Sequence, residues 1–552
     1  MERLKDILQF NTDYPLLFTQ LNFWIFFAIL YTGYCIVHKQ LSMRSLYLML
    51  VSLFFYYKTA GLFVSILIFS TINEYFVGRW LYEAQQPWKR KLLLIYTLVI
   101  NLGILAWFKY AYFFTDAYNQ MFDTQFEVIN VFGQWANGFF GSDYFRIDKI
   151  ILPAGISFYT FQSVSYALDI YRKEITPVKN ITDFGFFITF FPQLVAGPIV
   201  RASEFIPQIR KPFSLTQTQF GLAVFIILKG LIKKIMIADY LAVNFIDRVM
   251  QDPAHFSGFE NMCAMFAYSL QVYCDFSGYT DMAIGIALLM GFHLPQNFNA
   301  PYKAKNVGEF WKRWHITLSR FLKDYLYIPL GGNKKGTPGS YICLGLVLLF
   351  FSLMLKMYYL LFVFMGVSIL LYFLARLFPS IKNFINRDIN LLLTMVIGGL
   401  WHGASMNFLI WGGLNGIALI IYKYWKKISP YENKNTKLII FWRIFFTFTF
   451  ITFTRIFFRA PDFEKATEVM QQIFRDFHPE VAWHVVRNYW SVFAVMAAGF
   501  IMHWLPSATK GKIQDTFILQ PLAVKVVITT VTVFIIYQSV SSKFVPFIYF
   551  QF

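Results

Sequence analysis

Long apolar runs recur along the whole chain and constrain the fold more than any other feature. A helix needs about 20 apolar residues to cross the hydrocarbon core of a bilayer. Windows near this length lie at residues 19–37, 45–57, 60–78, 92–114, 183–197, 217–245, 258–291, 340–357, 359–377, 391–423, 437–459, 489–505 and 521–541. Some are too short to span, and 258–291 is long enough to be bent or doubled. The sequence therefore predicts an all-α, polytopic integral membrane protein with about 11 to 13 helical elements, some tilted or re-entrant.

Composition and charge agree with a membrane protein and exclude other classes. Only 14% of the 552 residues are charged, whereas a soluble domain has about 25%. This excludes a soluble enzyme, a disordered regulator and a secreted disulfide scaffold. The net charge of +19 would suggest nucleic acid in a soluble protein, but no basic run forms a separate polar domain. We therefore assign the excess to basic cytoplasmic loops, and we expect membrane lipid and no nucleic acid as a partner.

The charges between the windows predict the orientation. Basic residues gather at 38–44 and 88–91, which we place on the cytoplasmic side. Residues 115–149 instead hold five acids and two bases, and we expect this segment outside, with the N-terminus also outside. The segment is longer than a plain hairpin needs, so we expect it to shape an exit for substrate or a partner contact.

A basic and aromatic segment at 301–336 differs from the apolar windows. Aromatic residues alternate there with eight bases and two acids. From Val307 to Tyr327 the pattern predicts an amphipathic helix in the interface plane, which ends at Pro329. His315 lies on this element beside Trp314, and by itself it fits an interfacial histidine better than a catalytic one.

A second histidine, His402, lies inside the apolar run from Leu391 to Tyr422. It follows Asn390 by twelve residues, which places it about 18 Å along a helix and near the bilayer midplane. Gly398, Gly399 and Gly403 leave space beside it for another backbone or a ligand. The ring either donates one interhelical hydrogen bond or does chemistry, since polar groups at this depth are functional candidates.

General-base catalysis is the chemistry that one buried histidine can perform alone. A neutral imidazole can take the proton of a hydroxyl as its oxygen attacks an acyl group, which accelerates the reaction about 10²–10⁴-fold. A thioester donor supplies its own leaving group, so no covalent enzyme residue is required. The sequence has no HExxH, Gly-x-Ser-x-Gly, P-loop or Rossmann motif, and its four cysteines form no CxxC pair. We therefore predict no metal site.

Several motifs in the same order resemble the membrane-bound O-acyltransferase (MBOAT) superfamily, and most closely its bacterial alginate and peptidoglycan O-acetyltransferase-like branch. The two signatures are Gly399-Leu400-Trp401-His402-Gly403 and the stretch from Trp311 to Ser319, which reads WKRWHITLS. Further matching stretches lie at 152–162, 191–199, 273–283, 294–298, 457–460 and 547–552. The resemblance runs from about residue 150 to the end.

The resemblance implies a fold and a set of site residues. It implies helices ringing a central acyl-transfer tunnel, with His402 as the catalytic histidine and His315 as a second histidine that positions substrate across the tunnel. Weaker substrate or tunnel candidates in matching stretches are Trp401, Trp314, Asp275, Asp281, Gln193 and Arg201. For Asp275 and Asp281, buried hydrogen bonding that fixes helices is an equally good interpretation. The implied organisation is N-terminal helices at 1–149, a catalytic core at 150–460 and completing helices at 461–552.

The resemblance also implies a function. We expect a multi-pass protein of the bacterial inner membrane that moves acetyl groups across the membrane for O-acetylation of a cell-envelope polysaccharide. The donor would be a cytoplasmic thioester, such as acetyl-CoA as co-substrate. No tightly bound cofactor is expected, and a periplasmic SGNH-type transferase is the implied partner. The alternatives are D-alanyl transfer from an acyl carrier protein and a transporter without covalent chemistry.

Overall fold

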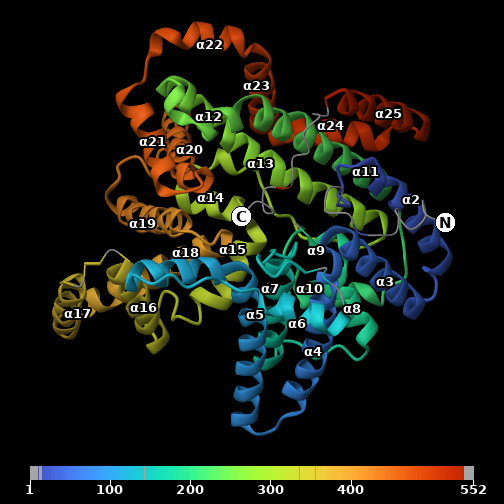
Figure 1. Cartoon of the computed structure of the whole chain (residues 1–552). Coiled ribbons are helices and arrows are strands. Elements are labelled where there is room, and N and C mark those ends of the chain that lie inside the picture. Colours follow the sequence, from blue (N-terminus) through green and yellow to red (C-terminus); the bar gives the residue numbers. More distant parts are fainter. Residues whose placement is uncertain are drawn as a thin grey trace. The chain divides into compact units, whose positions relative to one another are not determined.

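The computed structural model describes residues 10, 15–141, 143, 145–195, 197–334, 336–354, 356–357, 359–539 and 547. Every regular element in these ranges is a helix (Figure 1), which confirms the predicted all-α class. The chain forms two compact units that are each built from separated segments. The first contains residues 1–101, 154–317 and 440–552, and the second contains 102–153 and 318–439.

The first unit holds most of the helices. They are α2 (Leu21–Val37), α3 (Leu41–Ala60), α4 (Val64–Glu83), α7 (Ile156–Tyr171), α8 (Ile181–Thr189), α9 (Phe191–Leu194), α10 (Ala202–Ile209), α11 (Gln217–Leu231), α12 (Asp247–Gln251), α13 (Gly258–Leu289), α14 (Val307–Arg313), α21 (Phe463–Arg475), α22 (Ala482–Asn488), α23 (Trp490–Trp504), α24 (Ser507–Leu519) and α25 (Leu522–Ser539). Two π-helical segments, η2 (Ile232–Asp239) and η3 (Ala242–Ile246), follow α11, and the short η5 (Pro301–Lys303) precedes α14.

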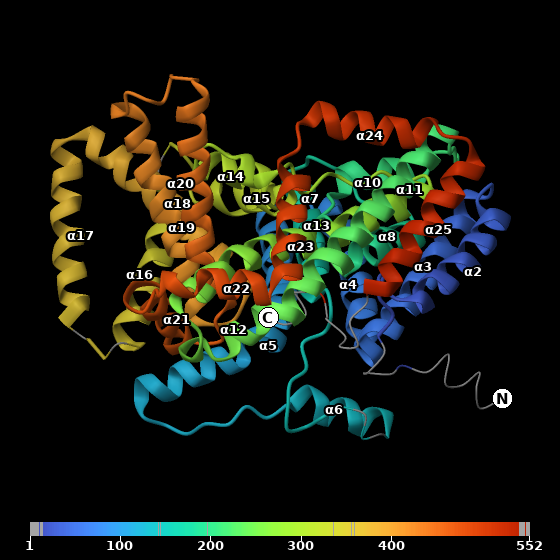
Figure 2. The same ribbon diagram turned by 90° about the horizontal axis from the view of Figure 1, so that it is seen from above.

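The second unit contains α6 (Val131–Phe140), the π-helical η6 (Lys323–Tyr327), α16 (Pro338–Met354), α17 (Tyr359–Leu377), α18 (Pro379–His402) and α19 (Met406–Ile428). Three further helices pass from one unit into the other, namely α5 (Pro87–Phe122), α15 (Ile316–Leu322) and α20 (Lys437–Arg459). Within the second unit α18 packs against α19, as Figures 1 and 2 show.

The long helix α13 is the centre of the first unit. Its start is fixed by a capping box, in which Ser257 accepts from the backbone N–H of Glu260 and the Glu260 side chain accepts from Ser257. Most of its residues are buried, and it packs along α11 and η2 (Figure 1). It runs for 32 residues as one continuous helix, so the window 258–291 is not doubled.

Five helical segments of the described chain are long and apolar enough to cross a membrane. They are Leu41–Glu83, Pro87–Phe122, Met406–Ile428, Lys437–Arg459 and Leu522–Ser539. One helix pair, Pro479–Asn488 with Trp490–Trp504, could form a sixth segment, since it passes the same test together but bends by 91°. These segments agree with a multi-pass membrane protein.

Two local predictions differ from the structure. The amphipathic helix expected from Val307 to Tyr327 is divided into α14, α15 and η6, because Trp314 is extended and His315 has a left-handed backbone with φ +43°. The segment 115–149 is not all loop, since α5 continues to Phe122 and α6 forms a further helix within it.

Candidate active site

His402 is the last residue of α18, at the turn of a helical hairpin. Gly403 and Ser405 have extended backbones, and α19 begins at Met406. The apolar run from 391 to 423 is therefore two antiparallel helices, with the histidine at the turn between them. His402 follows Asp388 on α18 by fourteen residues, or about 21 Å along the helix.

Two indole rings hold the His402 imidazole from the sides. The Trp401 and Trp411 rings each lie 5.0 Å from it, centroid to centroid, and both pairs are close to perpendicular. All three side chains are buried. Edge-to-face pairs of this kind restrict the rotation of the ring and surround it with apolar surface. Trp401, predicted as a substrate or tunnel residue, thus contacts the imidazole of His402.

Lys109 and Tyr110 of α5 bind the end of α18 that carries His402. The Lys109 ammonium donates to the carbonyl oxygens of Trp401 (2.6 Å) and His402 (3.2 Å), and the Tyr110 hydroxyl donates to that of Leu400 (2.9 Å). The last carbonyls of a helix have no partner within it, and a cation there also stabilises the helix dipole. α5 thus holds the backbone from which the imidazole projects.

The two arms of the hairpin touch backbone to backbone at a pair of glycines. A Cβ on Gly399 would lie 2.3 Å from the Phe408 carbonyl oxygen, and one on Gly412 would lie 2.4 Å from that of Met395. Only glycine allows this approach. The space expected beside Gly399 is thus filled by the backbone of α19, while the Phe408 ring lies against Gly403.

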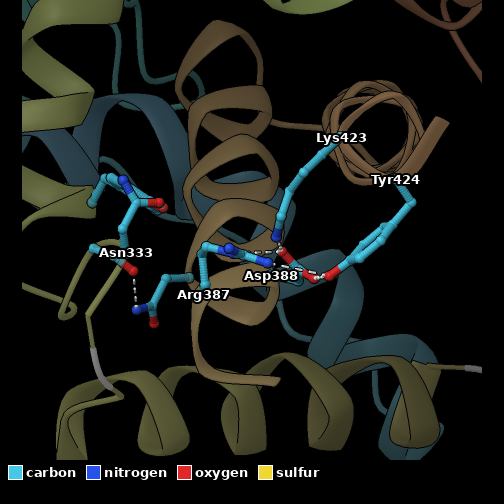
Figure 3. A network of polar contacts seen from close by, with 8 residues as sticks. Asn333, Arg387, Asp388, Lys423 and Tyr424 are labelled. Carbon is cyan, nitrogen blue, oxygen red and sulfur yellow. Dashed lines mark hydrogen bonds and ion pairs between the residues drawn. The ribbon is translucent and has the colours of Figure 1, made fainter. Parts of the chain in front are cut away.

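A polar cluster fastens the hairpin away from its turn (Figure 3). The Asp388 carboxylate of α18 binds the ammonium of Lys423 and accepts from the hydroxyl of Tyr424 at 2.6 Å, both on α19. Arg387 approaches the same carboxylate at 3.5 Å and donates to the Tyr424 hydroxyl. The hairpin is therefore held by polar contacts at its base and by Lys109 at its turn.

His315 is buried in the first unit, in the break between α14 and α15. Its Nδ1 lies 3.1 Å from Asn297 Oδ1, which also accepts from the backbone N–H (3.2 Å) and the hydroxyl (2.9 Å) of Thr317. Since that oxygen is an acceptor, Nδ1 carries the proton and Nε2 keeps its lone pair. The Phe276 ring packs edge-on against the imidazole at 4.7 Å.

Burial sets the charge of His315. Desolvation lowers its pKa from 6.5 to about 3, so the ring is neutral at physiological pH. The ring lies inside the protein and not on an exposed helix face. A neutral ring with a fixed tautomer can accept a hydrogen bond at Nε2 and position a hydroxyl or an N–H group.

Trp314 belongs to a buried cation–aromatic cluster rather than to an open surface. The Arg455 guanidinium lies 4.6 Å from the Trp314 ring and donates to the Tyr302 hydroxyl at 2.6 Å. Phe310 stacks on the other side of the cluster. These contacts assign Trp314 a packing role in the chain segment that carries His315.

Asp275 and Asp281 form buried ion pairs with lysines of η2 and α11. Asp275 binds Lys234 at 2.5 Å, and Asp281 binds Lys233 at 2.7 Å and Lys229 at 3.2 Å. This arrangement favours the interpretation that both carboxylates fix helices. A buried charge is stable only with such a partner.

The remaining predicted residues are Gln193 and Arg201. The Gln193 amide donates to the Phe187 carbonyl oxygen and joins α8 to α9. Arg201 is half-buried at the residue before α10. Among the described residues no group of three or more histidine, cysteine or acidic side chains has the arrangement of a metal site.

Comparison with known proteins identifies the class. Residues 171–384 match the membrane-bound O-acyltransferase family. A peptidoglycan O-acetyltransferase of Helicobacter pylori is 34% identical over 498 residues, which cover 85% of this chain and 81% of the relative. The probable alginate O-acetylase AlgI of Pseudomonas aeruginosa is 32% identical over 440 residues, covering 78% and 70%. A teichoic acid D-alanyltransferase of Bacillus subtilis is 29% identical over 289 residues, covering 50% and 61%.

The chain belongs to the membrane-bound O-acyltransferase family, and it is an acyltransferase. The predicted resemblance is thereby confirmed. His315 lies within the matched residues 171–384, whereas His402 and its cap by Lys109 lie outside them. Sequence reasoning missed Lys109, although a lone lysine inside the apolar window 92–114 was a visible signal.

Proposed function

We propose that this protein O-acetylates a cell-envelope polysaccharide and that His402 is its general base. The observation that carries the proposal is the placement of this buried imidazole at a hairpin turn, between two indoles and on a backbone held by Lys109. The relatives that match most of the chain are named O-acetyltransferases of peptidoglycan and alginate.

In the proposed reaction the acceptor hydroxyl binds at the His402 imidazole. The ring takes the hydroxyl proton while the oxygen attacks the carbonyl carbon of the thioester. The C–S bond then breaks, and the thiolate leaves with the proton. Apolar surroundings exclude the water that would otherwise hydrolyse the thioester. Neutral His315, with its Nε2 lone pair, is proposed to orient donor or acceptor.

The donor, location and partner are part of the same proposal. We place the protein in the bacterial inner membrane, with acetyl-CoA or a related thioester as cytoplasmic co-substrate. The acetyl group then reaches the polysaccharide directly or through a periplasmic SGNH-type transferase. The branch of teichoic acid D-alanyltransferases resembles a smaller part of the chain, so D-alanyl transfer is the second candidate.

Mass spectrometry of envelope glycans tests the proposal. Cells that carry the wild-type gene should show acetylated glycan, and a His402→Gln variant should lose the acetyl increment at equal amounts of membrane protein. The control is His484→Gln, which changes an exposed histidine. Persistent acetylation in the His402 variant would refute the assignment of the base. An alanyl increment in place of the acetyl one would favour the second candidate.

A further inference from the structure

His503 is a buried histidine that the proposed reaction does not use. It lies near the end of α23 with 1% of its surface exposed, packed against the rings of Tyr273 (4.7 Å) and Tyr302 (5.0 Å). Among the described residues neither ring nitrogen has a hydrogen-bond partner. A neutral imidazole always carries one N–H, and leaving such a donor buried and unpaired costs about 1–3 kcal/mol. The imidazole N–H is therefore an unpaired donor among the described residues.

Two lysine side chains bind backbone carbonyl oxygens at the end of α23, at and just after His503. The Lys510 ammonium donates to the His503 carbonyl oxygen at 2.8 Å, and the Lys303 ammonium donates to that of Leu505 at 2.7 Å. Each ammonium has three N–H groups, of which the carbonyl takes one. The lysines are thus fixed beside the link between α23 and α24, with donors remaining for a ligand.

The positive charge near His503 exceeds the charge of the carboxylate that pairs with it. The cations are Lys229, Lys233, Lys303 and Lys510, and the carboxylate is that of Asp281. Lys229 and Lys233 of α11 and η2 share Asp281, at 3.2 and 2.7 Å. Burial and the charges of Lys303, Lys233 and Lys229 lower the pKa of Lys510 to about 8. Four lysines against one carboxylate leave an excess of about three positive charges when all are protonated.

The start of α24 adds to the positive potential. This 13-residue helix begins at Ser507, directly after Pro506, without a side-chain cap and without an acid in its first turn. Its first N–H groups carry partial positive charge, and anions bind readily at such ends. α24 packs against α11 (Figure 2) and belongs to the same unit as the lysines.

We propose that His503, Lys303 and Lys510 form a binding site for a phosphoryl group. A carboxylate supplies one negative charge and does not balance the cluster, whereas a phosphomonoester or diphosphate supplies about two. An ammonium, an imidazole N–H and a helix start all donate to phosphate oxygens. Two ligands carry this chemistry, namely the phosphates of the thioester donor and the phosphomonoester headgroup of phosphatidic acid. The donor assignment rests on the proposed function.

Binding to the purified full-length protein tests the site without requiring acetyl transfer. The variants are Lys510→Gln, Lys303→Gln and His503→Phe, and the control is Lys512→Gln, an exposed lysine on the same helix α24. The probes are free coenzyme A, inorganic pyrophosphate and, by native mass spectrometry, phosphatidic acid retained from nanodiscs. Each site variant should weaken binding about 10- to 100-fold, the effect of one charge-assisted hydrogen bond, while the control binds as wild type does.

The outcomes separate the two ligands and the two proposals. Coenzyme A binding that the site variants weaken assigns the donor phosphates. Lipid retention that the site variants weaken, without coenzyme A binding, assigns a headgroup. The proposed site is refuted if every probe binds equally to the wild type, the site variants and the control. It is also refuted if no probe binds at all. His402→Gln should leave probe binding unchanged, so lost transfer with intact binding separates the base from the anion site.

Discussion

Replacing Lys109 by methionine tests whether α5 positions the candidate base. Methionine keeps the length and apolar stem of the side chain but removes the ammonium that donates to the carbonyl oxygens of Trp401 and His402. The shorter of the two hydrogen bonds, at 2.6 Å, is the stronger constraint. A hydrogen bond to a charged group contributes about 1.5–3 kcal/mol, and a cation at a helix C-terminus adds about 0.3–1 kcal/mol.

These energies predict the size of the kinetic effect. If the reaction geometry loses the energy of one such bond, kcat falls about 10- to 100-fold, because 1.4 kcal/mol corresponds to tenfold. KM should change little, since Lys109 contacts backbone and not the reacting groups. Lys109→Arg should recover part of the rate, because guanidinium donors can reach the same carbonyls.

The assay is acetyl transfer in membranes, with kcat and KM measured separately and the amount of folded protein matched. Lys426→Met is the control, because it removes an exposed lysine from α19. A Lys109→Met variant with wild-type kcat would refute the reasoning. Equal losses in the methionine and arginine variants, together with a lowered melting temperature, would reduce Lys109 to a structural role.

Three further predictions concern stability. Gly399→Ala should lower the melting temperature, because its Cβ would lie 2.3 Å from the Phe408 carbonyl oxygen. The control Gly413→Ala should be neutral or stabilising by about 0.5–1 kcal/mol, because its Cβ would meet nothing closer than 4.0 Å. Burial lowers the pKa of His315 to about 3, so its contribution to stability is complete above pH 6.5 and is lost as pH falls toward 3. In His315→Asn the melting temperature should therefore fall less steeply with acidification than in the wild type. Asp388→Leu should destabilise the hairpin by about 1–3 kcal/mol, measured by denaturant unfolding, because it removes the acceptor of Lys423 and Tyr424. An unchanged midpoint would contradict the role of this pair.

Apolar windows and short motifs were sufficient to predict the all-α class and the family. The windows near 391–423 and 437–459 correspond to helices because apolar length alone specifies a buried helix. Periodicity did not show that the first window turns back at Gly403, since the signal there is only a Gly-Ala-Ser interruption of three residues. The same holds for the break at His315, where a left-handed backbone divides an otherwise regular amphipathic pattern.

Contacts between distant segments were beyond the sequence. Lys109 is separated from Trp401 by 292 positions, and the local sequence around neither residue indicates their contact. The ion pairs of Asp275 and Asp281 depend on how α11 and η2 pack on α13, which spacing within one helix does not reveal. The sequence does not single out His503, because its lack of hydrogen-bond partners among the described residues depends on the folded structure.

The binding of Lys109 to the end of α18 imposes an order on biosynthesis. At about 5–20 residues per second, the ribosome needs about 15 to 60 s to make the 292 residues between Lys109 and Trp401. During that time α5 holds a lysine in its apolar run, which disfavours membrane insertion by about 2.5–3.5 kcal/mol. The helix must therefore be retained by its other apolar residues alone. Substitutions that make α5 more polar are then expected to reduce the yield of inserted protein even where the finished fold would tolerate them.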